Sequence, residues 1–200
     1  MHCPAIFVIF PLVFMQINVF AEDILATTED GRQVVLKVNG KWAFAGSNEK
    51  VVAFEGAGKV YTLTYKPLEW TTKGAPELDD AELSIKTKRG DVYCVIINER
   101  MATDIKQYGD VILNNSEEKC QKFEVVSDEV TKVNNTECRV VNVYASIQGM
   151  DIDYRYHFFC TKTHAVQLLF WGAKGNLQEA NKSVQLLVEG MVFGSDDPEK

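Results

Sequence analysis

The sequence predicts an α+β protein in which helices pack on an antiparallel β-sheet. Three observations support this fold class. Short alternating patterns of apolar residues, joined by tight turns, fill most of the segment 60–171, and one helical pattern at 102–119 interrupts them. A second helical pattern follows at 176–190. Strands that follow one another through tight turns pair in antiparallel fashion, because parallel strands need a long crossover connection.

The composition is that of a folded globular protein. Of the 200 residues, 46% are apolar and 24% are charged, which excludes a disordered or collagen-like chain. The 21 basic and 28 acidic residues give a formal net charge of −7. Proteins that bind nucleic acid or an anionic membrane surface need clustered Lys and Arg. We therefore expect neither of these as the partner.

Residues 1–21 have the pattern of a secretory signal peptide. They contain no Asp, Glu, Lys or Arg, they are mostly apolar, and Ala21 is followed at once by Glu22 and Asp23. We predict cleavage after Ala21 and a periplasmic or secreted mature chain with no integral membrane span. The alternative is an uncleaved anchor, although prolines and polar residues interrupt the apolar run at positions 4, 11, 16 and 18.

Export changes how the cysteines are interpreted. Removal of the leader leaves an even number: Cys94, Cys120, Cys138 and Cys160. An even number in an oxidising compartment predicts two disulfides. Of the three pairings, Cys138–Cys160 is geometrically awkward, because the hairpin expected over 137–162 points these side chains to opposite sides. The connectivity stays open, as does the alternative of free buried thiols.

The first elements after the leader form a three-stranded meander over 22–46. Asp30-Gly31 and Asn39-Gly40 are signals for two-residue hairpin turns, and they separate strands expected at 25–28, 33–38 and 41–45. Three such short strands are too few for a stable fold, so we interpret this segment as an appendage. A linker at 47–59, in which 51–54 has the pattern of a short strand, leads to the main domain.

The main domain is expected over 60–192 and begins with strands. A strand at 60–65 precedes a hairpin whose arms, 82–87 and 91–98, meet around Gly90. Residues 93–97 are apolar at every position, which predicts a central strand covered on both faces. The helix at 102–119 follows, with Thr103 as its N-cap and Gly109 as its weak point.

The second half of the domain is a meander followed by a helix. Four strands are expected at 121–131, 137–148, 151–161 and 165–171. Asn176 has the position of an N-cap, Glu179 that of its capping-box partner, and Gly190 that of the residue after the helix. Residues 193–200 are a polar tail.

Three stretches carry a resemblance to a known family. They read YTLTYKPLEW, AELSIKTKRGDVYCVIINER and CRVVNVYASIQGMDIDYRYHFFCTKTHAVQLLFW. In content and order they resemble the PsbP-like family over residues 60–192. The resemblance implies an α-β-α sandwich around a central antiparallel sheet, and accessory or assembly proteins that are mostly not enzymes. It implies no set of metal- or partner-binding residues, because no motif here anchors one.

The candidate catalytic and metal-binding groups have simple alternative interpretations. His157, Cys160 and His164 lie within eight residues but lack the paired spacing of zinc sites. Strand alternation places His157 and Cys160 on opposite faces. Asp151 and Asp153 share one face, as a glycosidase pair would, but so does any solvated hairpin end. We predict no catalytic residue, no cofactor and no metal.

The aromatic residues are more informative about function. Most of them are expected in the core, while Trp42, Trp70 and Trp171 are candidates for an exposed docking surface. We predict an exported non-enzymatic accessory or binding protein whose partner is an envelope protein. The alternative is a carrier of a small hydrophobic ligand, with a pocket between the sheet and a helix. An enzyme would need His157 or His164 within hydrogen-bond reach of a Cys or a carboxylate in a cleft.

Overall fold

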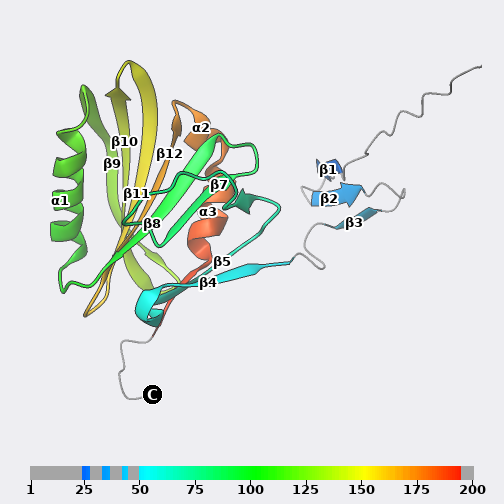
Figure 1. Ribbon diagram of the computed structural model, residues 1–200, viewed down its shortest axis with the longest axis horizontal. Helices are drawn as coiled ribbons and strands as arrows, with labels where there is room; N and C mark the ends of the chain where they lie inside the picture. Colours follow the sequence, from blue (N-terminus) through cyan, green and yellow to red (C-terminus); the bar gives the residue numbers. More distant parts are fainter. Residues whose placement is uncertain (1–23, 28–32, 37–41, 45–49, 195–200) are drawn as a thin grey trace, which may run out of the picture. The chain divides into compact units, whose positions relative to one another are not determined.

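The computed structural model describes residues 24–27, 33–36, 42–44 and 50–194 (Figure 1). The chain divides into two compact units, residues 1–49 and residues 50–200. The predicted signal peptide lies outside the described residues. Of the part that is described, no helix is both long and apolar enough to cross a membrane.

The first unit contains a three-stranded antiparallel sheet in the order β1-β2-β3. Its strands are β1 (Ile24–Thr27), β2 (Gln33–Leu36) and β3 (Trp42–Phe44). The meander expected from the two turn signals is confirmed, since β2 pairs with both of its neighbours in sequence.

The second unit is built on a seven-stranded antiparallel sheet in the order β6-β7-β8-β12-β11-β10-β9. Its strands are β6 (Trp70–Thr71), β7 (Leu83–Thr87), β8 (Val92–Glu99), β9 (Lys122–Val133), β10 (Thr136–Ile147), β11 (Met150–Cys160) and β12 (Ala165–Ala173). The expected four-strand meander is confirmed as β9 to β12. The all-apolar strand β8 lies inside the sheet, between β7 and β12.

A second, three-stranded sheet in the order β13-β5-β4 belongs to the same unit. It consists of β4 (Val52–Glu55), β5 (Tyr61–Tyr65) and β13 (Met191–Phe193), with the short 3-10 helix η1 (Ala57–Lys59) between β4 and β5. The segment interpreted as a linker therefore contributes a paired strand to the main unit. Met191 follows Gly190 and pairs with Leu63 of β5.

Helix α1 (Ile105–Glu117) packs against β10 and β11. Asp104, not the expected Thr103, is the N-cap, because its Oδ1 accepts from the backbone N–H groups of Lys106 (2.9 Å) and Gln107 (2.8 Å). Gly109 lies where the helix approaches the sheet most closely. A Cβ there would be 2.8 Å from Nη1 of Arg139 and 3.0 Å from Cδ2 of Phe158.

The expected C-terminal helix is two helices, α2 (Asn176–Glu179) and α3 (Asn181–Glu189), which meet at Ala180. The N-cap of α2 is Gly175 with φ of +92°, a conformation that favours glycine. Asn176, expected as the cap, instead donates from Nδ2 to the carbonyl of Asp91 at 3.0 Å. The helix thus begins with a bond to the β7–β8 hairpin rather than with a capping box.

Apolar side chains lie on both faces of the large sheet and form two clusters. One lies between the sheet and α2, α3 and β5, and includes Leu63, Phe159, Phe170 and Leu187. The other lies between the sheet and α1, and includes Tyr108 and Phe158. Helices therefore cover both faces, in the α-β-α layering that the resemblance implies (Figure 1).

The β10–β11 hairpin confirms the predicted faces and corrects the register. Its turn lies at Gln148-Gly149, both with positive φ, so that Val141 pairs with Tyr156 rather than with Phe158. The expected turn was one residue later along the chain. A register that differs by two residues leaves every side chain on its expected face, because strand side chains alternate with period two.

Candidate functional site

The sequence-predicted metal ligands do not converge. His157 is buried on the face covered by α3, while Cys160 packs with the cluster beneath α1 on the other face. His164 lies in the turn before β12, where its Nδ1 is 2.9 Å from the hydroxyl of Thr163. In the described ranges no group of three His, Cys, Asp or Glu side chains could hold a metal ion.

The four cysteines are free thiols, so the prediction of two disulfides is wrong for this structure. Cys94 and Cys138 share a face, but β12 and β11 lie between their strands. Three strand spacings of about 4.8 Å exceed the reach of a disulfide, which needs Cα atoms within about 7 Å. Cys120 and Cys160 lie near opposite ends of β11, since Gln121 bonds to Ser146. Burial raises the pKa of the Cys138 thiol to about 12 and that of Cys160 to about 11, so both are protonated at neutral pH.

The paired aspartates of β11 bond to a neighbouring strand and to the turn before α2. Asp151 accepts a hydrogen bond from the hydroxyl of Tyr144 at 2.6 Å, and Asp153 accepts one from the backbone N–H of Gly175 at 2.7 Å. The second contact fixes the turn that begins α2. Both carboxylates are thus used by the protein's own groups.

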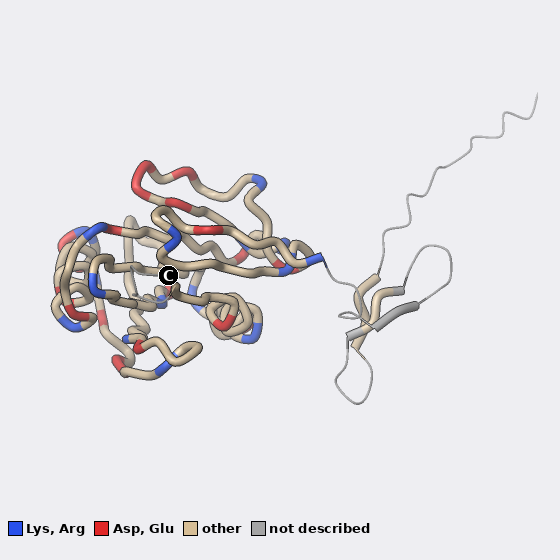
Figure 2. Tube along the Cα trace, turned by 90° about the horizontal axis from the view of Figure 1, so that it is seen from below, with Lys and Arg blue, Asp and Glu red and all other residues tan. Residues whose placement is uncertain are grey.

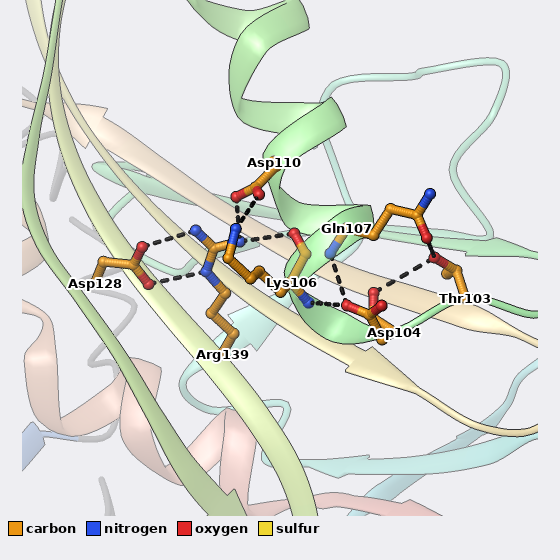
Figure 3. A network of polar contacts seen from close by, with 7 residues as sticks. All are labelled: Thr103, Asp104, Lys106, Gln107, Asp110, Asp128 and Arg139. Atoms are coloured by element: carbon orange, nitrogen blue, oxygen red, sulfur yellow. Dashed lines mark hydrogen bonds and ion pairs between the residues drawn. The ribbon is translucent and has the colours of Figure 1, made fainter.

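A buried arginine links α1 to the sheet (Figure 3). The Arg139 guanidinium contacts Asp128 at 2.7 Å, Asp110 at 2.8 Å and the carbonyl of Lys106 at 3.0 Å. The hydrogen bond from Lys106 lowers the pKa of Asp110 most, and the one from Arg139 lowers it further. Hydrogen bonds from Arg139 also lower the pKa of Asp128. The Arg139 charge is balanced by its neighbours, so this cluster is structural.

A groove lies between α3 and the strands β9, β10 and β11. It encloses about 420 Å³, a volume within the range of small-molecule sites. Glu129, Asn142, Arg155 and His157 lie on its sheet side, and Asn181 lies on its helix side. A smaller cavity of about 290 Å³ shares Asn142, Arg155 and Asn181 with it and continues toward α2.

Asn134 fixes the far end of this groove. Its Nδ2 donates to the carbonyls of Glu189 (2.8 Å) and Met191 (2.7 Å), which joins the β9–β10 turn to the end of α3. The positive φ of 47° at Asn134 suits a turn residue. The groove walls are therefore held at a fixed separation.

Arg155 lies in the middle of the groove, and its charge is not balanced by an ion pair. Its Nε donates to Oδ1 of Asn142 and its Nη1 to Oδ1 of Asn181, both at 2.7 Å. Among the described residues no carboxylate comes within ion-pair distance of it. Burial lowers the pKa of Arg155, and the charge of Glu129 opposes this shift only in part. The guanidinium stays charged, and its Nη2 makes no hydrogen bond or ion pair with the residues that the structure describes.

His157 lies next to Arg155 on the same face of β11 and is neutral. Burial, and then the charge of Arg155, lower the pKa of His157 to about 3. Its side chain packs edge-on against Phe170, and its Nδ1 has no hydrogen-bond partner among the described residues. A buried polar atom without a partner is costly, and this one is on a residue that lines the groove.

The three tryptophans proposed for docking have different surroundings. Trp70 is 1% exposed and packs edge-on against Phe170, so its expected role in docking is wrong: its side chain fills the core. Trp171 is partly exposed and stacks on Tyr93 at 5.5 Å between ring centroids. Trp42 has its backbone in β3, and its side chain lies outside the described residues.

Comparisons with known proteins give the fold. No protein-family model matches the sequence, and no curated protein matches it. Cyanobacterial PsbP (CyanoP) from Synechocystis sp. PCC 6803 superposes with a TM-score of 0.55 at 8% identity, over 75% of this chain and 96% of that one. The chain has the PsbP-like fold. The Ran-binding protein Mog1p of Saccharomyces cerevisiae is also similar, with a TM-score of 0.54 at 8% identity, over 73% of this chain and 96% of that one.

Within the PsbP-like fold, Arg155 and its groove are the site that sequence reasoning missed. Alternation places Arg155 and His157 on one face of the strand, which the sequence pattern predicts to be the solvent-exposed face, whereas α3 covers it in the structure. A charged residue at such a position is buried only with polar partners. Its partners Asn142 and Asn181 lie 13 and 26 residues away, and nothing local in the sequence identifies them.

Proposed function

We propose that this chain is a non-enzymatic binding protein of the cell envelope whose partner is a protein. The observation that carries the proposal is the stacked Tyr93–Trp171 pair. The two residues are paired across β8 and β12, whereas α1 packs against β10 and β11. Partly exposed aromatic pairs of this kind are enriched at protein interfaces, because they bury a large area with little loss of conformational entropy.

The state of the reactive groups supports a binding role over catalysis. Burial raises the pKa values of Cys138 and Cys160 and lowers that of His157 to about 3, so the thiols are protonated and the imidazole is too weak a base for efficient general-base catalysis. The fold is compatible with protein binding, since Mog1p is a Ran-binding protein. The charged residues are also mixed along the second unit, where Lys and Arg positions lie among those of Asp and Glu (Figure 2).

Site-specific photo-crosslinking tests this proposal. A benzoylphenylalanine at position 93 probes the docking surface, and one at Val192, which is 54% exposed on β13, is the matched control. In an extracytoplasmic extract of the source cells, we expect a discrete protein adduct from position 93 and none from position 192. Equal adducts from both positions, or turnover of any compound in a substrate panel, would contradict it.

A second candidate function, carriage of a small ligand, is favoured by the groove beside α3. The pocket lies between the sheet and a helix, where the sequence-based alternative places it. Its lining combines apolar side chains with Arg155, His157 and three asparagines, which favours a ligand that has a polar group. The purely hydrophobic ligand of that alternative does not fit a half-buried cation.

A further inference from the structure

We propose that the groove between α3 and β10–β11 binds a small monocarboxylate, with the carboxylate at Arg155 and a short apolar body along Val140, Val184 and Val188. The proposal deepens the second candidate function, on which it rests. It is independent of the docking surface at Tyr93 and Trp171, which lies on the opposite face of the sheet.

The geometry of Arg155 suits an anionic ligand. Two asparagine oxygens hold the guanidinium through Nε and Nη1 at 2.7 Å each, which orients it without neutralising it. The remaining N–H groups, one on Nη1 and two on Nη2, can donate to the two oxygens of a carboxylate. Arg139 shows the contrast, because two aspartates already occupy its guanidinium.

Polar groups at the groove that lack a partner are energetically costly. A partly buried cation without a counter-charge is unfavourable, and so is the buried Nδ1 of His157 without a partner. A bound carboxylate would offset the first cost.

One side of the groove is apolar. Val140, Val184 and Val188 line it and are 9%, 1% and 5% exposed. They present methyl groups beside His157, on the other side from the cavity that continues toward α2. A chain of a few methylenes fits this volume, and each buried methylene contributes about 0.8 kcal/mol.

Glu129 allows a test of the sign of the ligand's charge. It lines the same groove, and it is the carboxylate whose charge acts on Arg155. If the ligand is an anion, removal of this negative charge strengthens binding. If the groove binds a cation, the same change weakens binding.

The experiment is a titration of the full chain with hexanoate, followed by amide chemical shifts in NMR at low ionic strength. Acetate, phosphate, hexanol and hexylamine are the comparison probes. We expect hexanoate to bind with a Kd of about millimolar, as suits its few atoms. The shifts should map to the groove, and every comparison probe should bind more weakly.

Three variants complete the test. We expect Arg155→Met to weaken hexanoate binding about tenfold or more, because a charge-assisted contact is lost. We expect Glu129→Gln to tighten it about twofold, while Arg100→Met, an exposed arginine with the same charge change, leaves it unaltered. Glu129 is exposed, so its variant is informative even if Arg155→Met does not fold.

The outcomes that would overturn the proposal are also definite. The first is the absence of any amide chemical-shift change in the groove at a hexanoate concentration 50-fold above about 1 mM. The second is tighter binding of phosphate or hexylamine than of hexanoate. The third is weaker binding of hexanoate to the Glu129→Gln variant than to the wild type. Because the purified chain is used, any of these leaves the crosslinking result at position 93 unaffected, so failure of this site and failure of the protein-docking function are distinguishable.

Discussion

Two arginines in neighbouring strands show how surroundings decide the role of a residue. Arg139 is 7% exposed and carries two carboxylates and a backbone carbonyl. The Arg155 guanidinium donates to two neutral amide oxygens through Nε and Nη1, and its Nη2 has no hydrogen-bond partner among the described residues. The first arrangement fastens a helix to a sheet, and the second leaves a cation available to a ligand.

Arg139→Met should lower the free energy of unfolding by about 2 kcal/mol, because breaking a buried pair leaves Asp110 and Asp128 without their cation. The native pKa values of both carboxyls are lowered, so their contribution is present above about pH 4 and is lost as the pH falls through those values. Urea unfolding at pH 7 and at pH 3 measures this. A difference between wild type and variant that does not shrink at pH 3 would contradict it.

His157 should make the protein less stable as the pH falls below about 6. Its native pKa of about 3 lies below the usual value of 6.5, so in this interval the unfolded chain binds a proton that the native protein does not. The contribution is about 1.4 kcal/mol for each pH unit. His157→Phe should remove this slope between pH 6 and 4, whereas His164→Gln should keep it. Equal slopes in wild type and His157→Phe would show that the imidazole is not buried in the neutral form.

At the scale of elements, helices are positioned by close contacts rather than by helix propensity. Gly109 is a poor helix former, yet it allows α1 to reach Arg139 and Phe158. The break at Ala180 separates α2, which is fixed to the β7–β8 hairpin through Asn176, from α3, which is fixed to the β9–β10 turn through Asn134. Each helix thus follows the strands that hold it.

Gly109→Ala should destabilise the protein despite the better helix propensity of alanine. The added Cβ would lie 2.8 Å from Arg139 and 3.0 Å from Phe158, and such overpacking costs about 1–3 kcal/mol. Asn114→Ala, at an exposed position of α1, is the control and should leave stability equal or slightly higher. Thermal unfolding of the two variants decides this, and a Gly109→Ala variant as stable as wild type would contradict the close packing of α1.

At the scale of the whole molecule, the second unit contains its own core. Both apolar clusters consist of residues from Phe54 onward, on the two faces of one large sheet. The first unit contains three strands of three or four residues each. A sheet of that size buries too little apolar area to be stable by itself.

A chain that begins at Lys50 should therefore fold. We expect residues 50–200 to unfold cooperatively, with a free energy within about 0.5 kcal/mol of that of the full chain, because no cluster residue is removed. Far-UV circular dichroism and urea unfolding measure this. A truncated chain that unfolds without cooperativity would show that residues 1–49 contribute to the fold of the second unit.

The sequence by itself determined the fold class, the four-strand meander β9 to β12 and the opposite faces of Cys138 and Cys160. These follow from local apolar periodicity and turn residues, which need no knowledge of distant contacts. Even the incorrect register of the β10–β11 hairpin preserved the faces, since it was wrong by an even number of residues.

Only the tertiary structure decided the rest. Met191 joins a strand because Leu63 lies beside it, Trp70 is core because Phe170 faces it, and the cysteines stay apart because whole strands separate them. The groove also depends on pairs far apart in sequence, such as Arg155 with Asn181 and Asn134 with Met191. Such contacts form when the chain closes long loops, so the physical reason they are absent from local patterns is that no short segment contains both partners.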